Sequence, residues 1–260
     1  MKQASKILNF HKYHGTGNDF VLIDNREKKY DSITQEHVKF ICHRKFGIGS
    51  DGFILLEDSA KCDFAMRYFN SDGQEATMCG NGGRCIVLFA KHLGIIDDNA
   101  TFEAVDGIHS ASVLSTDIIC LEMPHCQIPV KISENRFFID TGSPHVVIFN
   151  ENIDKIDIAK EGKKIRLETN ANVNFCEIDN GTIQIRTFER GVEDETLSCG
   201  TGSIAAAIVA TVNGYLKKSE KIEIITKGGT LWVSFNYDKK IGKALLFGQA
   251  KKVFIGKIEI

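Results

Sequence analysis

Residues 198–210 read SCGTGSIAAAIVA, and residues 78–90 read MCGNGGRCIVLFA. Both segments place a cysteine in a glycine-rich turn directly before an apolar run. Gly94 and Gly214 each lie 15 residues after the cysteine of their segment, in the position typical of a helix C-terminus. We therefore predict two equivalent helices, each of which begins at a Cys-Gly turn.

The similarity between the two parts of the chain extends beyond these turns. Residues 66–69 (MRYF) match residues 185–188 (IRTF), and residues 102–107 match residues 222–228. A spacing near 120 residues is too long for a solenoid repeat and indicates two copies of one domain.

The predicted halves are residues 1–124 and residues 125–251, with a boundary near the proline-containing stretch at 124–129. Residues 252–260 form a final strand, which we expect to return to the first half.

The apolar run at 204–210 has no polar face, which is typical of a buried helix. Segments rich in β-branched residues surround both helices and predict strands. They are 20–23, 52–57, 64–69, 118–123, 146–149, 173–178, 182–188 and 231–235. The predicted fold class is therefore α+β, with two pseudo-symmetric halves, each a mixed, barrel-like sheet wrapped around a central buried helix.

The bulk composition narrows the class of protein. The 260 residues carry a net charge of −2 and 25% charged residues, so we expect no nucleic-acid partner and no acidic membrane partner. An export signal and a long uncharged apolar run are not evident, which predicts a cytoplasmic protein without membrane partners. The eight cysteines are then expected as reduced thiols, and their spacings are poor zinc signatures, so no metal is predicted.

The position of the two cysteines favours acid–base chemistry. Free N–H groups and the helix dipole at a helix N-terminus bind anions such as a carboxylate. The same field stabilises a cysteine thiolate. We therefore expect Gly80, Asn81, Gly200 and Thr201 to cradle a carboxylate.

Pseudo-symmetry would direct both helix N-termini at one ligand, with one sulfur on each face of its α-carbon. One thiolate would remove the α-proton, and the opposite thiol would deliver a proton to the other face. Hydrogen bonds to the carboxylate would stabilise the enediolate-like intermediate. The sequence thus predicts an amino-acid epimerase in which Cys79 and Cys199 are the acid–base pair.

Three other interpretations remain open. A single cysteine is usually a small buried hydrophobic residue. A nucleophilic Cys–His hydrolase accounts for one cysteine and leaves the other unexplained. A non-catalytic amino-acid-binding protein needs the carboxylate cradle and not the two thiols.

Four motifs make the chain resemble the diaminopimelate epimerases, and the resemblance covers nearly its whole length. They are His14-Gly15-Thr16-Gly17-Asn18-Asp19-Phe20, Phe69-Asn70-Ser71-Asp72-Gly73, the segment 78–85, and the segment 188–202, which runs from Phe188-Glu189-Arg190-Gly191 into Cys199-Gly200-Thr201-Gly202. Together and in this order they are highly specific.

The resemblance implies interconversion of LL- and meso-diaminopimelate, on the route to lysine and peptidoglycan, by a homodimer that uses neither pyridoxal phosphate nor a metal. Cys79 and Cys199 take the two catalytic positions, and their donor and acceptor roles swap with reaction direction. The residues that match substrate-binding positions are Asn18, Asn70, Gly80, Asn81, Asn172, Glu189, Arg190, Gly200 and Thr201. His145 and Glu189 match positions near the reacting amino group and are also expected to be catalytic.

Two positions depart from the family pattern. Asp51-Gly52 stands where many members carry Asp-Gln, and Ser143-Pro144-His145 stands where many carry Asn-Pro-His. Both departures are expected at the substrate site and leave the cysteine pair intact. The alternative functions within the same fold are a proline or hydroxyproline racemase or epimerase and an isomerase of the phenazine-biosynthesis type. These relatives lack the full segment at 189–196, and the last type also lacks the cysteine pair.

Overall fold

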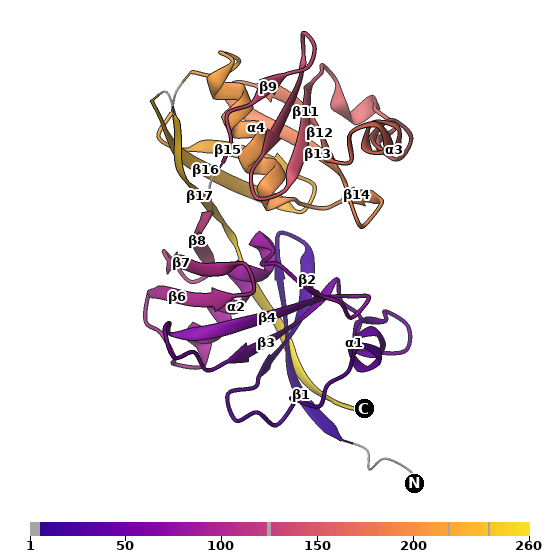
Figure 1. The fold of residues 1–260 in the computed structure, drawn as a ribbon, viewed down its shortest axis with the longest axis vertical. Coiled ribbons are helices and arrows are strands. Elements are labelled where there is room, and N and C mark those ends of the chain that lie inside the picture. The colour runs from indigo at the N-terminus through magenta and orange to yellow at the C-terminus, as the bar shows by residue number, and fades with distance from the viewer. Residues whose placement is uncertain (1–5, 124–125, 218, 239) are drawn as a thin grey trace. The chain divides into compact units, whose positions relative to one another are not determined.

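A computed structural model describes residues 6–123, 126–217, 219–238 and 240–260 (Figure 1). The chain divides into two compact units. The first unit comprises Met1–Leu121 with Gln249–Ile260, and the second comprises Glu122–Gly248. Among the described helices, none has the length and apolar character that crossing a membrane requires.

The first unit is a mixed sheet with two helices. Its elements are β1 (Ile7–Gly15), β2 (Asn18–Asp24), α1 (Gln35–Cys42), β3 (Gly52–Glu57), β4 (Phe64–Asn70), β5 (Glu75–Ala76), α2 (Gly80–His92), β6 (Asn99–Ala104), β7 (Gly107–Val113), β8 (Ile118–Met123) and β18 (Lys251–Glu259). The β2–β3 and β4–β6 pairs are parallel, and the other pairs in this unit are antiparallel.

The second unit repeats this plan. Its elements are β9 (Val130–Lys131), β10 (Arg136–Asp140), β11 (Pro144–Phe149), the short 3-10 helix η1 (Ile153–Lys155), α3 (Ile158–Thr169), β12 (Asn172–Asp179), β13 (Thr182–Glu189), β14 (Asp194–Thr196), α4 (Gly200–Val212), β15 (Ile222–Thr226), β16 (Gly229–Asp238) and β17 (Lys240–Gln249). Here β11–β12 and β13–β15 are the parallel pairs, at the positions of β2–β3 and β4–β6 in the first unit. The predicted α+β fold with an internal repeat is confirmed.

The topology of the two sheets explains why α1 and α3 are present. Parallel neighbours cannot be joined by a tight hairpin and need a crossover segment. The crossover α1 lies between β2 and β3, and α3 lies between β11 and β12. Thr34 caps α1 and Asp157 caps α3 with side-chain oxygens. These two helices were not among the sequence predictions.

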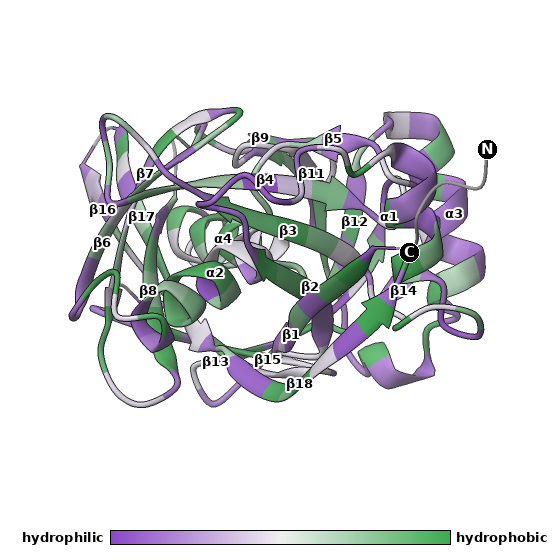
Figure 2. Cartoon of the chain, turned by 90° about the horizontal axis from the view of Figure 1, so that it is seen from below, coloured by the Kyte–Doolittle hydropathy of each residue, from purple (hydrophilic) through white to green (hydrophobic). Residues whose placement is uncertain are grey.

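The central helices α2 and α4 form the cores of their units. Every residue from Gly80 to Ala90 is buried in α2, and Ile204 to Ala210 are fully buried in α4. The strands around them supply long apolar faces, and β3 is coloured as hydrophobic over most of its length in Figure 2. Gly94 and Gly214 follow the helix ends with φ of +71° and +77°, which confirms the predicted helix termini.

The first unit is completed by a strand from a distant part of the sequence. The final strand β18 pairs antiparallel with β1 from Ile7↔Glu259 onward, and the yellow C-terminal strand lies beside β1 in Figure 1. In the second unit β9 takes the equivalent place beside β10. The final strand therefore completes the sheet of the first unit, beside its first strand.

The contact between α3 and β13 depends on a glycine. A Cβ added at Gly162 would lie 2.5 Å from Cβ and 2.8 Å from Cγ of Phe188, which is 1% exposed. We expect Gly162→Ala to lower the free energy of unfolding by roughly 1–2 kcal/mol, because overpacking outweighs the better helix propensity of alanine. Urea unfolding would measure the change.

The matched control is Lys163→Ala, at the neighbouring exposed position of α3. Equal stability of the two variants would show that the close approach of α3 to Phe188 does not constrain the fold.

Candidate active site

Cys79 occupies the N-cap position of α2 and has extended backbone angles. The chain turns directly into the helix, and Gly83 N–H donates to Cys79 O at 2.7 Å. The Cys79 Sγ lies 3.8 Å from Asn18 Oδ1, within the range of a hydrogen bond from a thiol. The hairpin between β1 and β2 therefore brings the predicted binding residue Asn18 to the predicted catalytic cysteine.

The orientation of the Asn18 amide is set by its neighbours. Its Nδ2 donates to Asp51 Oδ2 at 2.7 Å, so its Oδ1 faces the cysteine. The same Oδ1 accepts from Asn81 Nδ2 at 3.1 Å. Arg44 in turn binds Asp51 at 2.6 Å. Asn18, Asn81 and Cys79 thus form one hydrogen-bonded group.

Arg84 supports this group from inside the core. The side chain is fully buried and donates to Asn81 Oδ1 at 2.8 Å, Thr16 Oγ1 at 3.1 Å and Gly80 O at 3.3 Å. Burial lowers the pKa of Arg84 to about 10, so it remains charged at neutral pH. Arg84 belongs to the motif at 78–85, but no role was predicted for it. A charged residue within a predicted buried helix was the signal that could have identified it.

Cys199 occupies the equivalent N-cap of α4 and has different neighbours. Its Sγ accepts from Gly202 N–H at 3.4 Å, and Thr201 Oγ1 lies at 3.5 Å. The hydroxyl of Ser143 lies 3.3 Å from Thr201 Oγ1. Cys199 is 8% exposed, and Thr201 is half-buried. The second cysteine therefore lies at a helix N-terminus, where its sulfur accepts a hydrogen bond from a backbone N–H.

His145 is fully buried behind this turn. Its Nε2 lies 3.0 Å from Ser143 Oγ, and its Nδ1 lies 3.1 Å from Asn174 Nδ2. Burial and the positive charge of Arg190 lower the pKa of His145 to about 3. The imidazole is therefore neutral at physiological pH and connects to Cys199 through Ser143 and Thr201.

Asn172, at the start of β12, joins the other predicted residues of the second unit. Its Oδ1 accepts from Arg190 N–H at 2.9 Å, and its Nδ2 donates to Pro144 O at 3.1 Å and Ser143 Oγ at 3.4 Å. Arg190 is exposed, and its guanidinium donates to Asn170 O at 3.2 Å. Glu189 is half-buried at the end of β13. Asn172 thus anchors the β13 turn that carries Glu189 and Arg190.

The departure at Gly52 has a structural explanation. A Cβ at this position would lie 2.6 Å from Cε2 of Tyr68, so the tyrosine ring takes the space of any larger residue. The Tyr68 hydroxyl donates to Asn70 Oδ1 at 2.8 Å and fixes the amide of this predicted binding residue. Tyr68, which sequence reasoning did not single out, therefore links the two positions.

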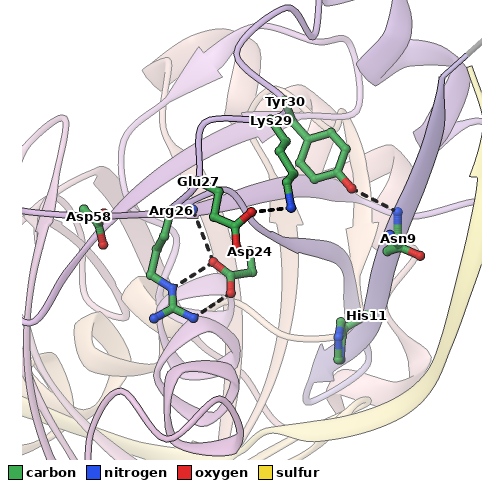
Figure 3. A pocket seen from close by; sticks show the side chains of 8 residues that line it. All are labelled: Asn9, His11, Asp24, Arg26, Glu27, Lys29, Tyr30 and Asp58. Carbon is green, nitrogen blue, oxygen red and sulfur yellow. Dashed lines mark hydrogen bonds and ion pairs between the residues drawn. The ribbon is translucent and has the colours of Figure 1, made fainter.

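A polar hollow of about 460 Å³ also lies in the first unit (Figure 3). It is lined by Asn9, His11, Asp24, Arg26, Glu27, Lys29, Tyr30 and Asp58, a set that contains none of the predicted site residues. Arg26 binds Asp24 through two hydrogen bonds, and Lys29 pairs with Glu27. We assign no chemistry to this hollow, because its charges largely neutralise one another.

Comparison with known proteins agrees with the motifs. The diaminopimelate epimerase family matches the chain over residues 10–119 and 137–253. The chain is 47% identical to a diaminopimelate epimerase of Flavobacterium psychrophilum, over 95% of this chain and 98% of the relative. It is 42% identical to that of Chlorobaculum tepidum, over 95% of this chain and 99% of the relative.

Solved structures of lower identity share the fold. A phenazine biosynthesis protein of Bacillus anthracis aligns with a TM-score of 0.74 at 18% identity, over 98% of this chain and 99% of that one. A hydroxyproline epimerase of Agrobacterium vitis aligns with a TM-score of 0.72 at 13% identity, over 98% of this chain and 93% of that one.

The two cysteine turns differ in how much space their second glycine has. A Cβ at Gly202 would lie 2.4 Å from Asn174 Oδ1 and 3.3 Å from Cys199 Sγ, whereas at the equivalent Gly82 the nearest atom is Ile54 Cδ1 at 3.3 Å. Because Asn174 is held by three hydrogen bonds, we expect Gly202→Ala to lower the free energy of unfolding by roughly 1–3 kcal/mol.

Gly82→Ala is the matched control in α2, and it should cost clearly less. Chemical denaturation of both variants would measure the difference, and an equal loss in the two would contradict the constraint assigned to Asn174.

The buried neutral His145 makes stability depend on pH. Its folded pKa lies below the unfolded value, so its contribution is complete above about pH 6.5 and is lost as pH falls toward about 3. Between about pH 7 and pH 5 we expect the free energy of unfolding to fall by roughly 2 kcal/mol through this residue alone. Urea unfolding of wild type and His145→Asn at both pH values would reveal it as a shallower dependence in the variant.

The corresponding change at exposed His43, His43→Asn, serves as the control. An unchanged pH dependence in His145→Asn would mean that His145 is not the group that titrates.

Proposed function

The chain belongs to the diaminopimelate epimerase family, and we propose that it interconverts LL- and meso-2,6-diaminopimelate with Cys79 and Cys199 as the acid–base pair. The observation that carries this proposal is the repeated cysteine turn. Each unit begins its buried central helix with a cysteine at the N-cap, in an equivalent strand environment. The identity to relatives named for this activity supports the choice of substrate.

The proposed reaction inverts one α-carbon in two proton transfers. One thiolate removes the α-proton and becomes a thiol, and the opposite thiol delivers its proton to the other face and becomes a thiolate. The backbone N–H groups of Gly80, Asn81, Gly200 and Thr201 are proposed to receive the carboxylate, at the positive ends of α2 and α4. These groups stabilise the negative charge that develops on the carboxylate oxygens.

The remaining predicted residues are proposed to recognise the substrate's polar groups. Arg190 has an exposed guanidinium suited to bidentate binding of the distal carboxylate. Asn18, Asn70 and Asn172 offer amide donors and acceptors for the ammonium and carboxylate groups. Glu189 is proposed to accept from the reacting ammonium. We propose that His145 acts through Ser143 and Thr201, because its ring is buried and its two nitrogens have partners within the protein.

The proposed mechanism draws only on side chains and backbone groups of this chain, so it needs neither pyridoxal phosphate nor a metal. We propose a cytoplasmic homodimer with a small-molecule substrate and without nucleic-acid or membrane partners. A sedimentation experiment would test the oligomeric state.

The decisive test is isomerisation in heavy water. Purified protein with reductant and without added cofactor is incubated with LL-diaminopimelate, and both deuterium incorporation and the meso isomer are followed. Wild type should produce the meso isomer with deuterium at the inverted carbon. Cys79→Ala and Cys199→Ala should each lower epimerisation by several orders of magnitude, because each removes one of the two proton-transfer groups.

Cys62→Ala is the matched control, since Cys62 is a half-buried free cysteine in the loop before β4. Racemisation of proline or hydroxyproline without action on diaminopimelate would support the alternative function instead. Binding of diaminopimelate without any hydrogen exchange would indicate a non-catalytic binding protein and refute the proposal.

A further inference from the structure

The first unit has a glycine where the second unit has a predicted binding residue. Gly52 directly precedes the β3 residue that pairs with Phe69. Asn172 directly precedes the β12 residue that pairs with Phe188, and Phe188 is the counterpart of Phe69 in the repeat. Gly52 and Asn172 are therefore equivalent positions. The second unit presents a side-chain amide there, and the first unit presents no side chain.

A tyrosine from the neighbouring strand takes the space beside Gly52. Gly52 lies opposite Asn70 in the β3–β4 ladder, so both residues face the same side of the sheet as Tyr68. A Cβ at Gly52 would lie 2.6 Å from Cε2 of Tyr68. The ring also makes an edge contact with Phe20 of β2, with ring centroids 6.0 Å apart. Tyr68 is 8% exposed, so its ring is packed in this place.

The hydroxyl of this tyrosine orients Asn70. Asn70 is exposed at the end of β4, and the turn to β5 holds its backbone, because its N–H donates to Gln74 O at 3.0 Å and its C=O accepts from Gly73 N–H at 2.9 Å. The Tyr68 hydroxyl donates to Asn70 Oδ1 at 2.8 Å. With its oxygen directed at Tyr68, the amide offers its NH2 group to an acceptor. A carboxylate oxygen is such an acceptor, whereas an ammonium group is not.

The second unit holds the equivalent strand end from a different position. Asn172 Oδ1 accepts from Arg190 N–H at 2.9 Å at the end of β13, the counterpart of the end of β4. Thr187, the counterpart of Tyr68, donates instead to Asn174 Oδ1 at 3.0 Å, and Thr187 is 3% exposed. The polar contact to the strand end thus comes from position 172 in one unit and from position 68 in the other.

We propose that Tyr68 replaces the side chain absent at position 52. As a positioning residue of the substrate site, it holds Asn70 so that the Asn70 NH2 group donates to a carboxylate of the substrate. This inference rests on the proposed function, and it adds a residue that determines substrate affinity in this chain. It also couples positions 52 and 68, because a larger residue at 52 requires a smaller one at 68.

The first test removes the hydroxyl and keeps the ring. An equilibrium mixture of LL- and meso-diaminopimelate is titrated into wild type and Tyr68→Phe by calorimetry, and kcat and KM are measured in parallel. We expect Kd and KM to rise roughly three- to tenfold, the effect of one hydrogen bond, because the Asn70 amide loses its fixed orientation. We expect kcat to stay within about twofold, since the cysteines keep their positions.

Tyr30→Phe is the matched control. Tyr30 is 7% exposed in the same unit, and its hydroxyl accepts from Asn9 N–H at 3.5 Å. It lines the polar hollow, which contains none of the predicted site residues. Kd in this variant should equal that of wild type. A Kd that is unchanged in Tyr68→Phe, or raised equally in both variants, would overturn the proposal.

The second test uses the coupling between the two positions. Gly52→Gln introduces the residue that many family members carry, and its side chain collides with the Tyr68 ring, so we expect Kd to rise roughly tenfold or more. Tyr68→Leu removes both the hydroxyl and the collision. In Gly52→Gln/Tyr68→Leu the glutamine amide takes over the role of the hydroxyl, and Kd should return to within about threefold of wild type.

Urea unfolding of the same variants separates positioning from packing. If Tyr68 only fills space, the double variant regains stability without regaining affinity, and that result would overturn the proposal. The two proposals also fail separately. Epimerisation of diaminopimelate with the wild-type Kd in Tyr68→Phe would refute only the present inference. A wild-type protein that racemises proline and not diaminopimelate, with a proline affinity that depends on the Tyr68 hydroxyl, would refute the proposed function alone.

Discussion

Burial of an apolar helix inside a curved sheet is the constraint on which the rest of each unit depends. The helices α2 and α4 have almost no exposed side, so sheet strands must surround them. One end of such a helix still has unpaired N–H groups and a positive dipole. A cysteine placed at that end meets a field that favours a thiolate. In both units a cysteine occupies this position, at the N-cap of the core helix.

The two units share the backbone of the cysteine turn, but the side chains around the turn differ. The second residue after the cysteine is Asn81 in one turn and Thr201 in the other. Asn81 is held from the core by buried Arg84, whereas Thr201 is approached from a neighbouring strand end by Ser143. The two turns therefore surround equivalent cysteines with different hydrogen-bonding groups.

Much of this architecture was predictable from sequence because it depends on short-range patterns. The Cys-Gly turns, the all-apolar run at 204–210 and the closing glycines Gly94 and Gly214 predicted the two core helices, and the structure confirms them. The crossover helices α1 and α3 were missed, because both lack the long apolar runs on which the helix predictions relied. The site contacts depend on pairings distant in sequence, such as His145 with Asn174 across two parallel strands. Register of that kind is set by the assembled sheet and cannot be read from a local pattern.

The pairing of β18 with β1 has a consequence for the order in which the protein matures during synthesis. The second unit, Glu122–Gly248, lies wholly within a continuous stretch, and it is translated before the last strand of the first unit. Until residues 251–259 emerge, β1 has an open edge on the side that β18 will occupy. Domains usually fold in the order in which they are translated. Here the unit that begins the chain is the one that closes last, and nascent chains carry an unfilled sheet edge that chaperones or a second nascent chain can reach.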